Sequence, residues 1–311
     1  MLNRRSLALS SLLFFSASKI LGQAAVPVNL NIFASAKNTA TFPFEWREGM
    51  IFIPVSISGS QTLHFVLDTG STRILIDKSI ANSLGLKGAE SGSLQGAGTG
   101  RIATEALHHI DLDFPDLQSK DYECVTADLA PLEQTLKTKV DGILGYEVFS
   151  RFVITVDFKA KQLTVTLPSA FLAPEGAEEL PIAIHDKWAF VKGTLVLPGP
   201  VAVSDSFLID SGSSDAVDHP IVKTMQSRTT SKSGIGLGAP TDGAIARADS
   251  FRIGTFTVKK PILSCCGATE DRSRLIGTEV LRHFLVTFDY PGARLFLAPQ
   301  NGWPESAMVR S

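Results

Sequence analysis

The feature that most constrains the fold of this 311-residue chain is an internal repeat. Residues 143–165 align without a gap on residues 275–297, at a constant offset of 132. Seven of the 23 aligned positions are identical, whereas average composition gives roughly one or two identities by chance. The identical pairs are Gly145/Gly277, Glu147/Glu279, Val148/Val280, Phe152/Phe284, Thr155/Thr287, Asp157/Asp289 and Leu163/Leu295. A chain with such a repeat is expected to fold as two copies of one structural unit.

Two shorter elements precede this segment in both copies and in the same order. Residues 65–71 (FVLDTGS) match residues 207–213 (FLIDSGS) at an offset of 142. Residues 96–100 (GAGTG) match residues 234–238 (GIGLG) at an offset of 138. Because three elements recur in one order, the repeat extends over most of each half of the chain.

Each copy has the pattern of β-strands. Apolar runs at residues 50–57 and 62–67 flank a Ser-Gly-Ser turn, and runs at residues 188–196 and 201–209 flank a Pro-Gly-Pro turn; both arrangements are hairpin signals. We therefore predict an all-β fold made of two tandem, pseudo-symmetric β-barrel-like halves. The predicted domain boundaries are an N-terminal half at 25–170, a linker at 171–181 and a C-terminal half at 182–311.

One short helix is expected soon after the Asp-x-Gly element of each copy. Asp77 can cap a helix over Lys78–Leu84, with Gly85 as the stop. Asp218 can cap a helix that begins at His219 and Pro220, where proline is tolerated.

The first 24 residues have the pattern of an export signal. A basic start at Asn3-Arg4-Arg5 precedes an uncharged stretch at residues 6–17, and Gly22-Gln23-Ala24 supplies small residues at the spacing that signal peptidase reads. We expect residues 1–24 to be removed on export, by either the general secretory or the twin-arginine route. The mature protein is then expected to be periplasmic or extracellular.

Charge and composition exclude several classes of partner. Apolar residues make up 44% of the chain and charged residues 19%, which is globular composition. The net charge of −2 falls to −5 once the predicted signal is removed. Because there is no basic excess, we expect no nucleic-acid partner. No other apolar run is long enough to span a bilayer, so we expect no integral membrane association after signal removal.

Two copies of a four-residue motif carry the chemistry. Residues 68–71 (DTGS) and 210–213 (DSGS) each follow an apolar run. Such a strand carries the aspartate into the interior, the glycine lets the chain turn tightly beside it, and neighbouring hydroxyls can satisfy its oxygens. Two aspartates related by the repeat can meet between the halves. Carboxylates that share a site hold one proton between them, so one can act as general base on a water while the other polarises a carbonyl.

These motifs, each followed by an apolar-apolar-Gly element at residues 143–145 and 275–277, resemble those of the aspartic proteases, both pepsin-like and retroviral. The resemblance covers about residues 43–297 and implies that Asp68 and Asp210 are the catalytic dyad. It also implies that Thr69 and Ser211 lock the two loops together. The remaining residues that it assigns to support of the dyad are Gly70, Ser71, Gly212 and Ser213, with both serines as outer hydrogen-bond donors to the aspartates.

The glycine-rich elements resemble the flaps of this family, β-hairpins that close over the substrate. Gly98 lies 30 residues after Asp68, and Gly236 lies 26 residues after Asp210, as in each subunit of the retroviral type. The resemblance therefore implies a fused dimer of retroviral-type units with two flaps, although neither tip has the tyrosine of the pepsin flap. A plain Gly-rich turn is the alternative. The predicted flap residues are Gly96, Gly98, Gly100, Gly234, Gly236 and Gly238.

The other repeated or reactive residues are expected to be structural. Asp157 and Asp289 each end a strand-like run before a turn, where aspartate usually accepts backbone N–H bonds. The six histidines have no metal-binding spacing, so no metal site is predicted. The three cysteines permit one disulfide and a spare thiol or a vicinal link, and we expect them to be small buried thiols without a catalytic role: Cys124, Cys265 and Cys266.

Together these observations predict an exported aspartic endopeptidase, a hydrolase that attacks the peptide bond directly with an activated water. No covalent intermediate, metal or cofactor is expected. The expected partner is a peptide or protein substrate in the cleft between the halves, and the protein is expected to act as a monomer. Two alternatives stay open: a non-catalytic peptide-binding protein on the same fold, or a processing protease dedicated to one substrate.

Overall fold

The computed structural model describes residues 30–94, 101–233, 241–265, 274–300 and 308–310. The predicted export signal and all six predicted flap glycines lie outside these ranges. In the part that is described, no helix is long and apolar enough to cross a membrane.

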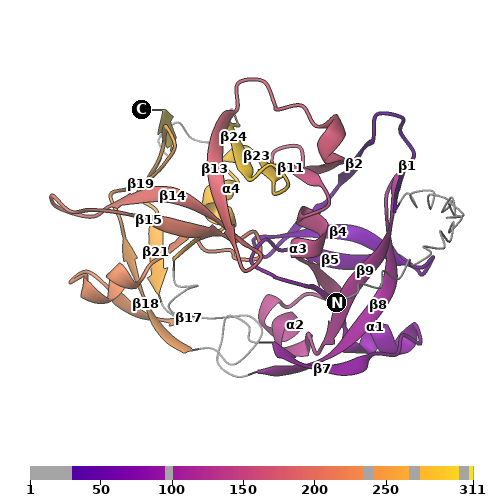
Figure 1. Cartoon of the computed structure of the whole chain (residues 1–311). Helices are drawn as coiled ribbons and strands as arrows, with labels where there is room; N and C mark the ends of the chain where they lie inside the picture. The colour runs from indigo at the N-terminus through magenta and orange to yellow at the C-terminus, as the bar shows by residue number, and fades with distance from the viewer. Residues whose placement is uncertain (1–29, 95–100, 234–240, 266–273, 301–307, 311) are drawn as a thin grey trace, which may run out of the picture.

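The described chain is mostly β-strand, arranged in two large sheets, so the predicted all-β class is confirmed (Figure 1). The first sheet contains β1 (Asn31–Phe33), β3 (Glu45–Arg47), β4 (Met50–Ile57), β5 (Leu63–Leu67), β6 (Ile74–Asp77), β7 (Ala89–Leu94), β8 (Ile102–Phe114), β9 (Leu117–Ala127) and β10 (Gly142–Leu144).

The second sheet takes one strand from the N-terminal end of the chain and the rest from later segments. It contains β2 (Thr39–Pro43), β11 (Val153–Asp157), β12 (Gln162–Thr166), β13 (Glu178–His185), β14 (Trp188–Val196), β15 (Ala202–Ile209), β16 (Val217–Asp218), β17 (Thr229–Ser233), β18 (Thr241–Arg247), β19 (Ser250–Ile253), β20 (Phe256–Lys259), β21 (Ile262–Cys265), β22 (Leu275–Ile276), β23 (Phe284–Asp289), β24 (Arg294–Pro299) and β25 (Met308–Arg310). The short helices are α1 (Lys78–Ser83), α2 (Ala130–Leu136), α3 (Tyr146–Phe149), α4 (Thr278–Leu281) and the 3₁₀ turns η1 (Pro168–Ala170) and η2 (Pro220–Thr224).

Strand pairing around the two aspartate motifs follows one pattern. Strands β4 and β5 form a hairpin, and β10 runs parallel to β5 and antiparallel to β6. Strands β14 and β15 form a hairpin, and β22 runs parallel to β15 and antiparallel to β16. Since β10 and β22 lie at the start of the two aligned segments, the same pairings occur at matching positions of the sequence repeat.

Strands from both halves of the chain meet in the second sheet. Strand β11 pairs antiparallel with β23, with Thr155 opposite Thr287 and their hydroxyl oxygens 2.8 Å apart. Strands β12 and β2 continue the sheet on one side of this pair, and β24 and β13 continue it on the other. Phe149 of α3 packs edge-on against Phe288, with ring centroids 5.6 Å apart. The sheet thus ties the N-terminal strands to the C-terminal ones (Figure 1).

The apolar residues form two buried clusters that follow strand alternation. The larger cluster contains Ile51 and Ile53 of β4 and Ile74 of β6. A smaller cluster contains Phe52 and Leu75, which lie between those positions and therefore project from the opposite face. The central strands β4, β5, β6 and β10 are thus buried on both faces, as their nearly continuous apolar sequences require.

Both predicted hairpins and the first predicted helix are confirmed. Asp77 caps α1, its Oδ1 accepting the backbone N–H of Ser79 at 2.9 Å. The prediction for the second helix is wrong, because Asp218 is the last residue of β16 and does not cap. Its neighbour His219 takes that role, with Nδ1 accepting the N–H of Ile221 at 3.0 Å, and the turn that follows is the 3₁₀ segment η2.

The segment expected to be a linker ends inside a strand. Residues 178–181 belong to β13 and pair with β24 from Leu297 back to Arg294. Burial of Leu180 in the main apolar cluster explains why this end of the segment is ordered as sheet.

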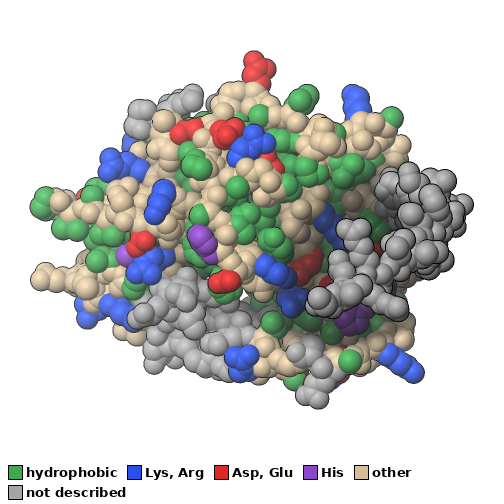
Figure 2. All heavy atoms as spheres, viewed as in Figure 1, with side chains coloured by type: hydrophobic (Ala, Val, Ile, Leu, Met, Phe, Trp, Pro, Cys, Tyr) green, Lys and Arg blue, Asp and Glu red, His purple; other side chains and the backbone are tan. Residues whose placement is uncertain are grey.

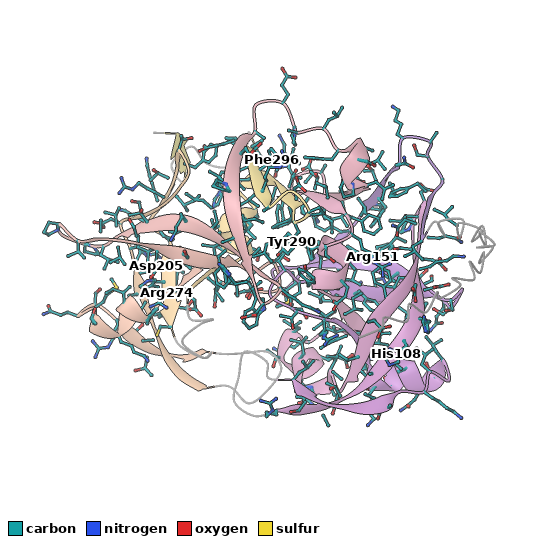
Figure 3. All side chains as sticks on the ribbon, in the orientation of Figure 1. His108, Arg151, Asp205, Arg274, Tyr290 and Phe296 are labelled. Atoms are coloured by element: carbon teal, nitrogen blue, oxygen red, sulfur yellow. The ribbon has the colours of Figure 1, made fainter. Side chains whose placement is uncertain are left out.

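On the face of the molecule seen in Figure 2, acidic and basic side chains are interspersed. The labelled residues of Figure 3 include one charged pair on the C-terminal sheet, in which Arg274 Nε lies 2.7 Å from Asp205 Oδ2. His219 Nε2 lies 3.6 Å from the same carboxylate oxygen.

The aspartates at the ends of β11 and β23 have the structural role that we expected. Asp289 Oδ1 accepts the N–H of Gly292 at 2.8 Å, and its Oδ2 binds Arg294 Nη2 at 2.5 Å. Asp157 Oδ1 accepts the N–H of Ala160 at 2.8 Å and the side-chain amide of Gln300 at 2.5 Å, and it has no cationic partner among the described residues. Asp289 is buried, with 2% of its surface exposed, whereas Asp157 is only partly buried.

Replacing Asp289 by alanine is therefore expected to destabilise the fold more than replacing Asp157. The Asp289→Ala variant removes the carboxylate that binds Arg294 Nη2 and the N–H of Gly292, at a cost of about 2 kcal/mol in the free energy of unfolding. Arg294 keeps only the longer contact of its Nη1 with Glu179, at 3.6 Å. The Asp157→Ala variant is the matched control from the other copy and should cost about 1 kcal/mol. Urea unfolding measures both, and equal losses would contradict this account.

Candidate active site

Each aspartate motif begins where a buried strand ends. Asp68 follows β5, and its N–H donates to the carbonyl of Leu144 at 3.0 Å. Asp210 follows β15, and its N–H donates to the carbonyl of Ile276 at 2.9 Å. Both motifs are thus anchored by a backbone bond to the apolar-apolar-Gly element of their own half.

The two motifs are joined by a reciprocal exchange of hydrogen bonds. The N–H of Thr69 donates to Ser211 Oγ at 3.0 Å, and the N–H of Ser211 donates to Thr69 Oγ1 at 2.8 Å. Each hydroxyl then donates across the interface, Thr69 to the carbonyl of Ile209 at 2.7 Å and Ser211 to that of Leu67 at 2.8 Å. Both side chains are almost completely buried. The four bonds hold the two loops in one relative position, with little water to compete for them.

The glycines of the motifs bring the two carboxyl groups together. A Cβ atom at Gly70 would lie 2.7 Å from the Asp210 carboxyl group, and a Cβ atom at Gly212 would lie 2.3 Å from Asp68 Cγ. Each carboxyl group therefore rests against the glycine of the opposite motif, where only glycine fits. Each also accepts the N–H of its own glycine, at 2.7 Å in the first motif and 3.0 Å in the second.

The predicted outer serines bond within their own loops. Ser71 Oγ donates to the carbonyl of Arg73 at 2.8 Å, and Ser213 Oγ accepts the N–H of Asp215 at 3.2 Å. Their role as donors to the aspartates stays a prediction.

The turns that lead into β4 and β14 each contact the other half of the chain, and these contacts were not predicted from the sequence. The indole Nε1–H of Trp188 donates to the carbonyl of Gly70 at 2.9 Å. Next to it, Lys187 Nζ lies 3.1 Å from the Glu147 carboxylate. In the opposite direction, the hydroxyl of Thr278 donates to the carbonyl of Gly49 at 2.7 Å. These contacts join segments far apart in the sequence, so no local sequence pattern predicts them.

A second missed residue is Tyr290, labelled near the middle of the molecule in Figure 3. Its ring stacks on Phe149 with centroids 5.2 Å apart. Burial raises the pKa of the Tyr290 hydroxyl, and the nearby negative charges of Asp68 and Asp210 raise it further. The Tyr290 phenol therefore stays neutral.

The strands on either side of both glycine-rich segments form hairpins. Leu94 of β7 pairs with Ile102 of β8. Ser233 of β17 pairs with Thr241 of β18. The glycines themselves lie outside the described residues, so the flap assignment stays a prediction.

A row of five paired residues flanks Asp68 on the N-terminal sheet. Successive pairings link Phe52, Val66, Ile143, Leu75 and Val125. Directly paired residues project from the same face of a sheet, and we call this set the N-terminal row. All five belong to the smaller apolar cluster, on which Leu94 and Ile102 at the base of the β7–β8 hairpin pack. The row is therefore an apolar wall beside the first aspartate and below that hairpin.

The corresponding C-terminal row flanks Asp210. Successive pairings link Phe190, Leu208, Leu275, Asp218 and Ser264. By position in the pairing pattern, Asp218 takes the place of Leu75 and Ser264 that of Val125. This wall is therefore apolar for three positions and polar for two.

The three cysteines differ in state. Cys124 is a free, buried thiol whose pKa is raised by burial, which disfavours the thiolate that a nucleophile needs. Cys265 is disulfide-bonded, so the expectation of free thiols is wrong there. Cys266 lies outside the described residues.

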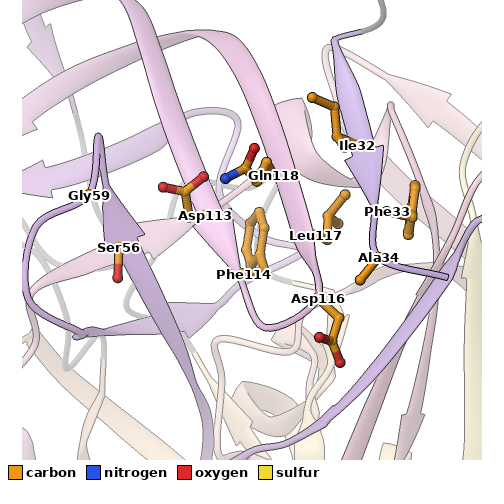
Figure 4. Close-up of a pocket in the computed structure, with 10 residues that line it drawn as sticks. All are labelled: Ile32, Phe33, Ala34, Ser56, Gly59, Asp113, Phe114, Asp116, Leu117 and Gln118. Carbon is orange, nitrogen blue, oxygen red and sulfur yellow. The ribbon is translucent and has the colours of Figure 1, made fainter.

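A surface hollow of about 430 Å³ lies elsewhere, between β1 and the turns that follow β4 and β8 (Figure 4). Its lining includes Asp113 and Asp116 but no residue of either aspartate motif. The hollow is thus separate from the junction of the two motifs, which is the candidate active site because the two carboxyl groups lie there.

Comparison with known families agrees with this location. Residues 53–148 match a family model described as aspartyl protease. The matched stretch runs from β4 into α3 and contains the first aspartate motif, its apolar-apolar-Gly element and the N-terminal row except Phe52. Comparison with curated proteins gave no match. This part of the chain therefore has the features of an aspartyl protease domain, and the family supports hydrolysis of peptide bonds in general.

Removing the hydroxyl of Thr69 is expected to destabilise the junction. The Thr69→Val variant keeps the shape but leaves the buried N–H of Ser211 and the carbonyl of Ile209 without partners, at a cost of about 3 kcal/mol in the free energy of unfolding. The control is Thr39→Val, because the Thr39 hydroxyl pairs with Thr166 at 3.0 Å in a less buried part of the sheet. Chemical unfolding should give less than about 1 kcal/mol for this control. A Thr69→Val loss no larger than the control's would contradict the proposed lock.

The Asp218 carboxyl predicts a pH dependence of stability. Burial raises its pKa from 3.8 to about 7; a Ser264 hydrogen bond opposes the rise, and the charges of Asp215 and Asp210 add to it. Between those pH values the folded state binds more protons at this site than the unfolded state, so its contribution to stability decreases as pH rises.

The Asp218→Asn variant lacks this titration. Relative to the wild type, it should gain on the order of 2 kcal/mol in the free energy of unfolding between about pH 4.5 and 7.5. Urea unfolding at several pH values measures the difference, with Asp116→Asn, which replaces an exposed carboxyl, as the control. A constant difference between wild type and Asp218→Asn across this range would refute the assignment.

Proposed function

We propose that this protein is an aspartic endopeptidase in which Asp68 and Asp210 activate a water molecule for attack on a peptide bond. The observation that carries the proposal is the position of each carboxyl group against the glycine of the opposite motif. The family match over residues 53–148 supports the same class of reaction for the half that holds Asp68.

The proposed reaction needs one proton shared by the carboxyl pair. The ionised carboxylate takes a proton from the water, whose oxygen forms a bond to the carbonyl carbon of the substrate. The protonated carboxyl group gives its proton to the carbonyl oxygen, which yields a tetrahedral diol. As the diol collapses and the C–N bond breaks, the carboxyl group that took the water proton gives it to the leaving nitrogen. One diol hydroxyl gives its proton to the other carboxylate as the C=O bond forms, so the pair is again singly protonated.

The surroundings suit this chemistry. The Thr69 and Ser211 exchange fixes the carboxyl groups before substrate arrives, so little reorganisation is needed during the reaction. The two rows provide walls on either side of the pair. An extended peptide between them would bind much as an added strand does, under the β7–β8 and β17–β18 hairpins.

The proposal extends to the architecture and location of the protein. Matching strand pairings around both motifs support two fused retroviral-type units within one chain, and hence a monomer. The signal pattern of residues 1–24 supports export to the periplasm or beyond.

The decisive test is cleavage of casein by the purified protein between about pH 3 and pH 8, with and without pepstatin. The Asp68→Asn and Asp210→Asn variants are each expected to lower the rate at least about a thousandfold, because each removes one member of the acid–base pair. The control variant Asp116→Asn lies in the surface hollow and should keep full activity. Thermal unfolding of every variant checks that the fold is intact.

Two outcomes would redirect the proposal. Cleavage that survives either substitution in the pair would place the chemistry elsewhere. A folded wild type that is inert at every pH would favour the peptide-binding alternative or a single dedicated substrate.

A further inference from the structure

The two rows beside the carboxyl pair differ in chemistry at matching positions. All five residues of the N-terminal row are buried and apolar. In the C-terminal row, Leu208 and Leu275 are buried apolar residues, but the last two positions are Asp218 and Ser264. Since Val66 and Leu208 each lie two residues before an aspartate, both rows project toward the side on which the carboxyl pair lies.

The Asp218 carboxyl is buried, with 7% of the residue exposed, and its Oδ1 has no hydrogen-bond partner among the residues that the structure describes. No helix cap uses it, because His219 caps η2 instead. Two basic groups on this part of the sheet contact Asp205 instead: Arg274 Nε lies 2.7 Å and His219 Nε2 lies 3.6 Å from its carboxylate. The charged groups that act on Asp218 are Asp215 and Asp210, both acidic. A buried carboxyl that has acids but no cation around it in the described part of the chain is costly unless a partner arrives from outside.

We propose that Asp218 and Ser264 form a substrate subsite for a basic side chain, lysine or arginine, at one fixed position relative to the scissile bond. This inference rests on the proposed function of the same site and names its substrate class. The N-terminal row, with leucine and valine at the two matching positions, takes an apolar side chain on the other side of the bond.

The rest of the C-terminal row fits a long basic side chain. Phe190, which is half-buried, and Leu275 offer apolar surface to the methylene stem, as lysine and arginine stems usually require, with the fully buried Leu208 between them in the row. The ammonium or guanidinium group then meets the Asp218 carboxylate, while the Ser264 hydroxyl donates to the same carboxylate. An acidic side chain at this position would face three carboxyl groups, Asp210, Asp215 and Asp218, and is excluded by like charge.

The test is digestion of a synthetic peptide mixture, with cleavage positions read by mass spectrometry. The wild type should cut sites with lysine or arginine at one fixed position at least about tenfold more often than sites with norleucine there, the value of one charge-assisted hydrogen bond. Asp218→Asn keeps the shape and should reduce the enrichment to about twofold or less. Asp218→Leu copies the N-terminal row and should favour norleucine. Glu175→Gln removes an exposed charge outside both rows and should leave the enrichment unchanged.

A binding arm separates this inference from the proposed catalysis. A variant with both Asp68→Asn and Asp210→Asn is mixed with a fluorescein-labelled lysine peptide or its norleucine counterpart, and fluorescence anisotropy gives the affinities. The lysine peptide should bind about tenfold more tightly, and adding Asp218→Asn should remove the difference. Circular dichroism checks that each variant is folded.

The outcomes distinguish the two proposals. No cleavage by the wild type, together with Asp218-dependent binding of the lysine peptide, would overturn the protease and support the subsite. Cleavage without a preference for basic residues, or with a preference that Asp218→Asn leaves intact, would overturn the subsite alone. Absence of both cleavage and Asp218-dependent binding would overturn both.

Discussion

The hydrogen-bond exchange between Thr69 and Ser211 is the interaction on which the rest of the site depends. Each residue donates its backbone N–H to the other's hydroxyl, and each hydroxyl donates to a carbonyl of the opposite strand end. A bond network of this kind has one geometry in which all donors and acceptors are satisfied. It therefore sets the distance between the β5 and β15 ends, and the contact of each carboxyl group with the opposite glycine follows from that distance.

This junction is supported from both directions by longer-range contacts. The β11–β23 pair joins the halves in one sheet, with Thr155 opposite Thr287. Trp188 and Gly49 bring the turn of each half against the motif of the other. Each motif loop is held by the strand before it, by the Thr69 and Ser211 hydrogen bonds and by a turn from the other half, so it has little conformational freedom left. Such preorganisation is what an acid–base pair needs to act without rearranging.

Much of this arrangement could be predicted from the sequence, because its signals are local or repeated. Alternation and turn residues located the hairpins around Gly59 and Gly199, and the repeat paired Asp68 with Asp210. The contact between Trp188 and Gly70 could not be predicted, since it joins residues 118 positions apart and depends on how two hairpins lie in space. Tyr290 was missed for the same reason. Asp218 was misread as a cap, because an aspartate before a His-Pro pair looks like a helix start, whereas strand pairing with Ser264 and Leu275 holds it in β16.

The polar end of the C-terminal row shows what a single chain with two motifs can do that a symmetric dimer cannot: its two walls can carry different residues. In a dimer of identical subunits, a change from leucine to aspartate in one wall appears in both walls, because one sequence encodes them. Two further carboxylates would then face each other across the Asp68 and Asp210 pair and raise the cost of ionising any of them. A chain that encodes each wall separately can place Leu75 beside one aspartate and Asp218 beside the other. The core faces behind the rows stay apolar in both halves, with Ile74 and Val217 in the same main cluster. Selectivity can thus change on one wall while the packing that holds the carboxyl pair is left as it is.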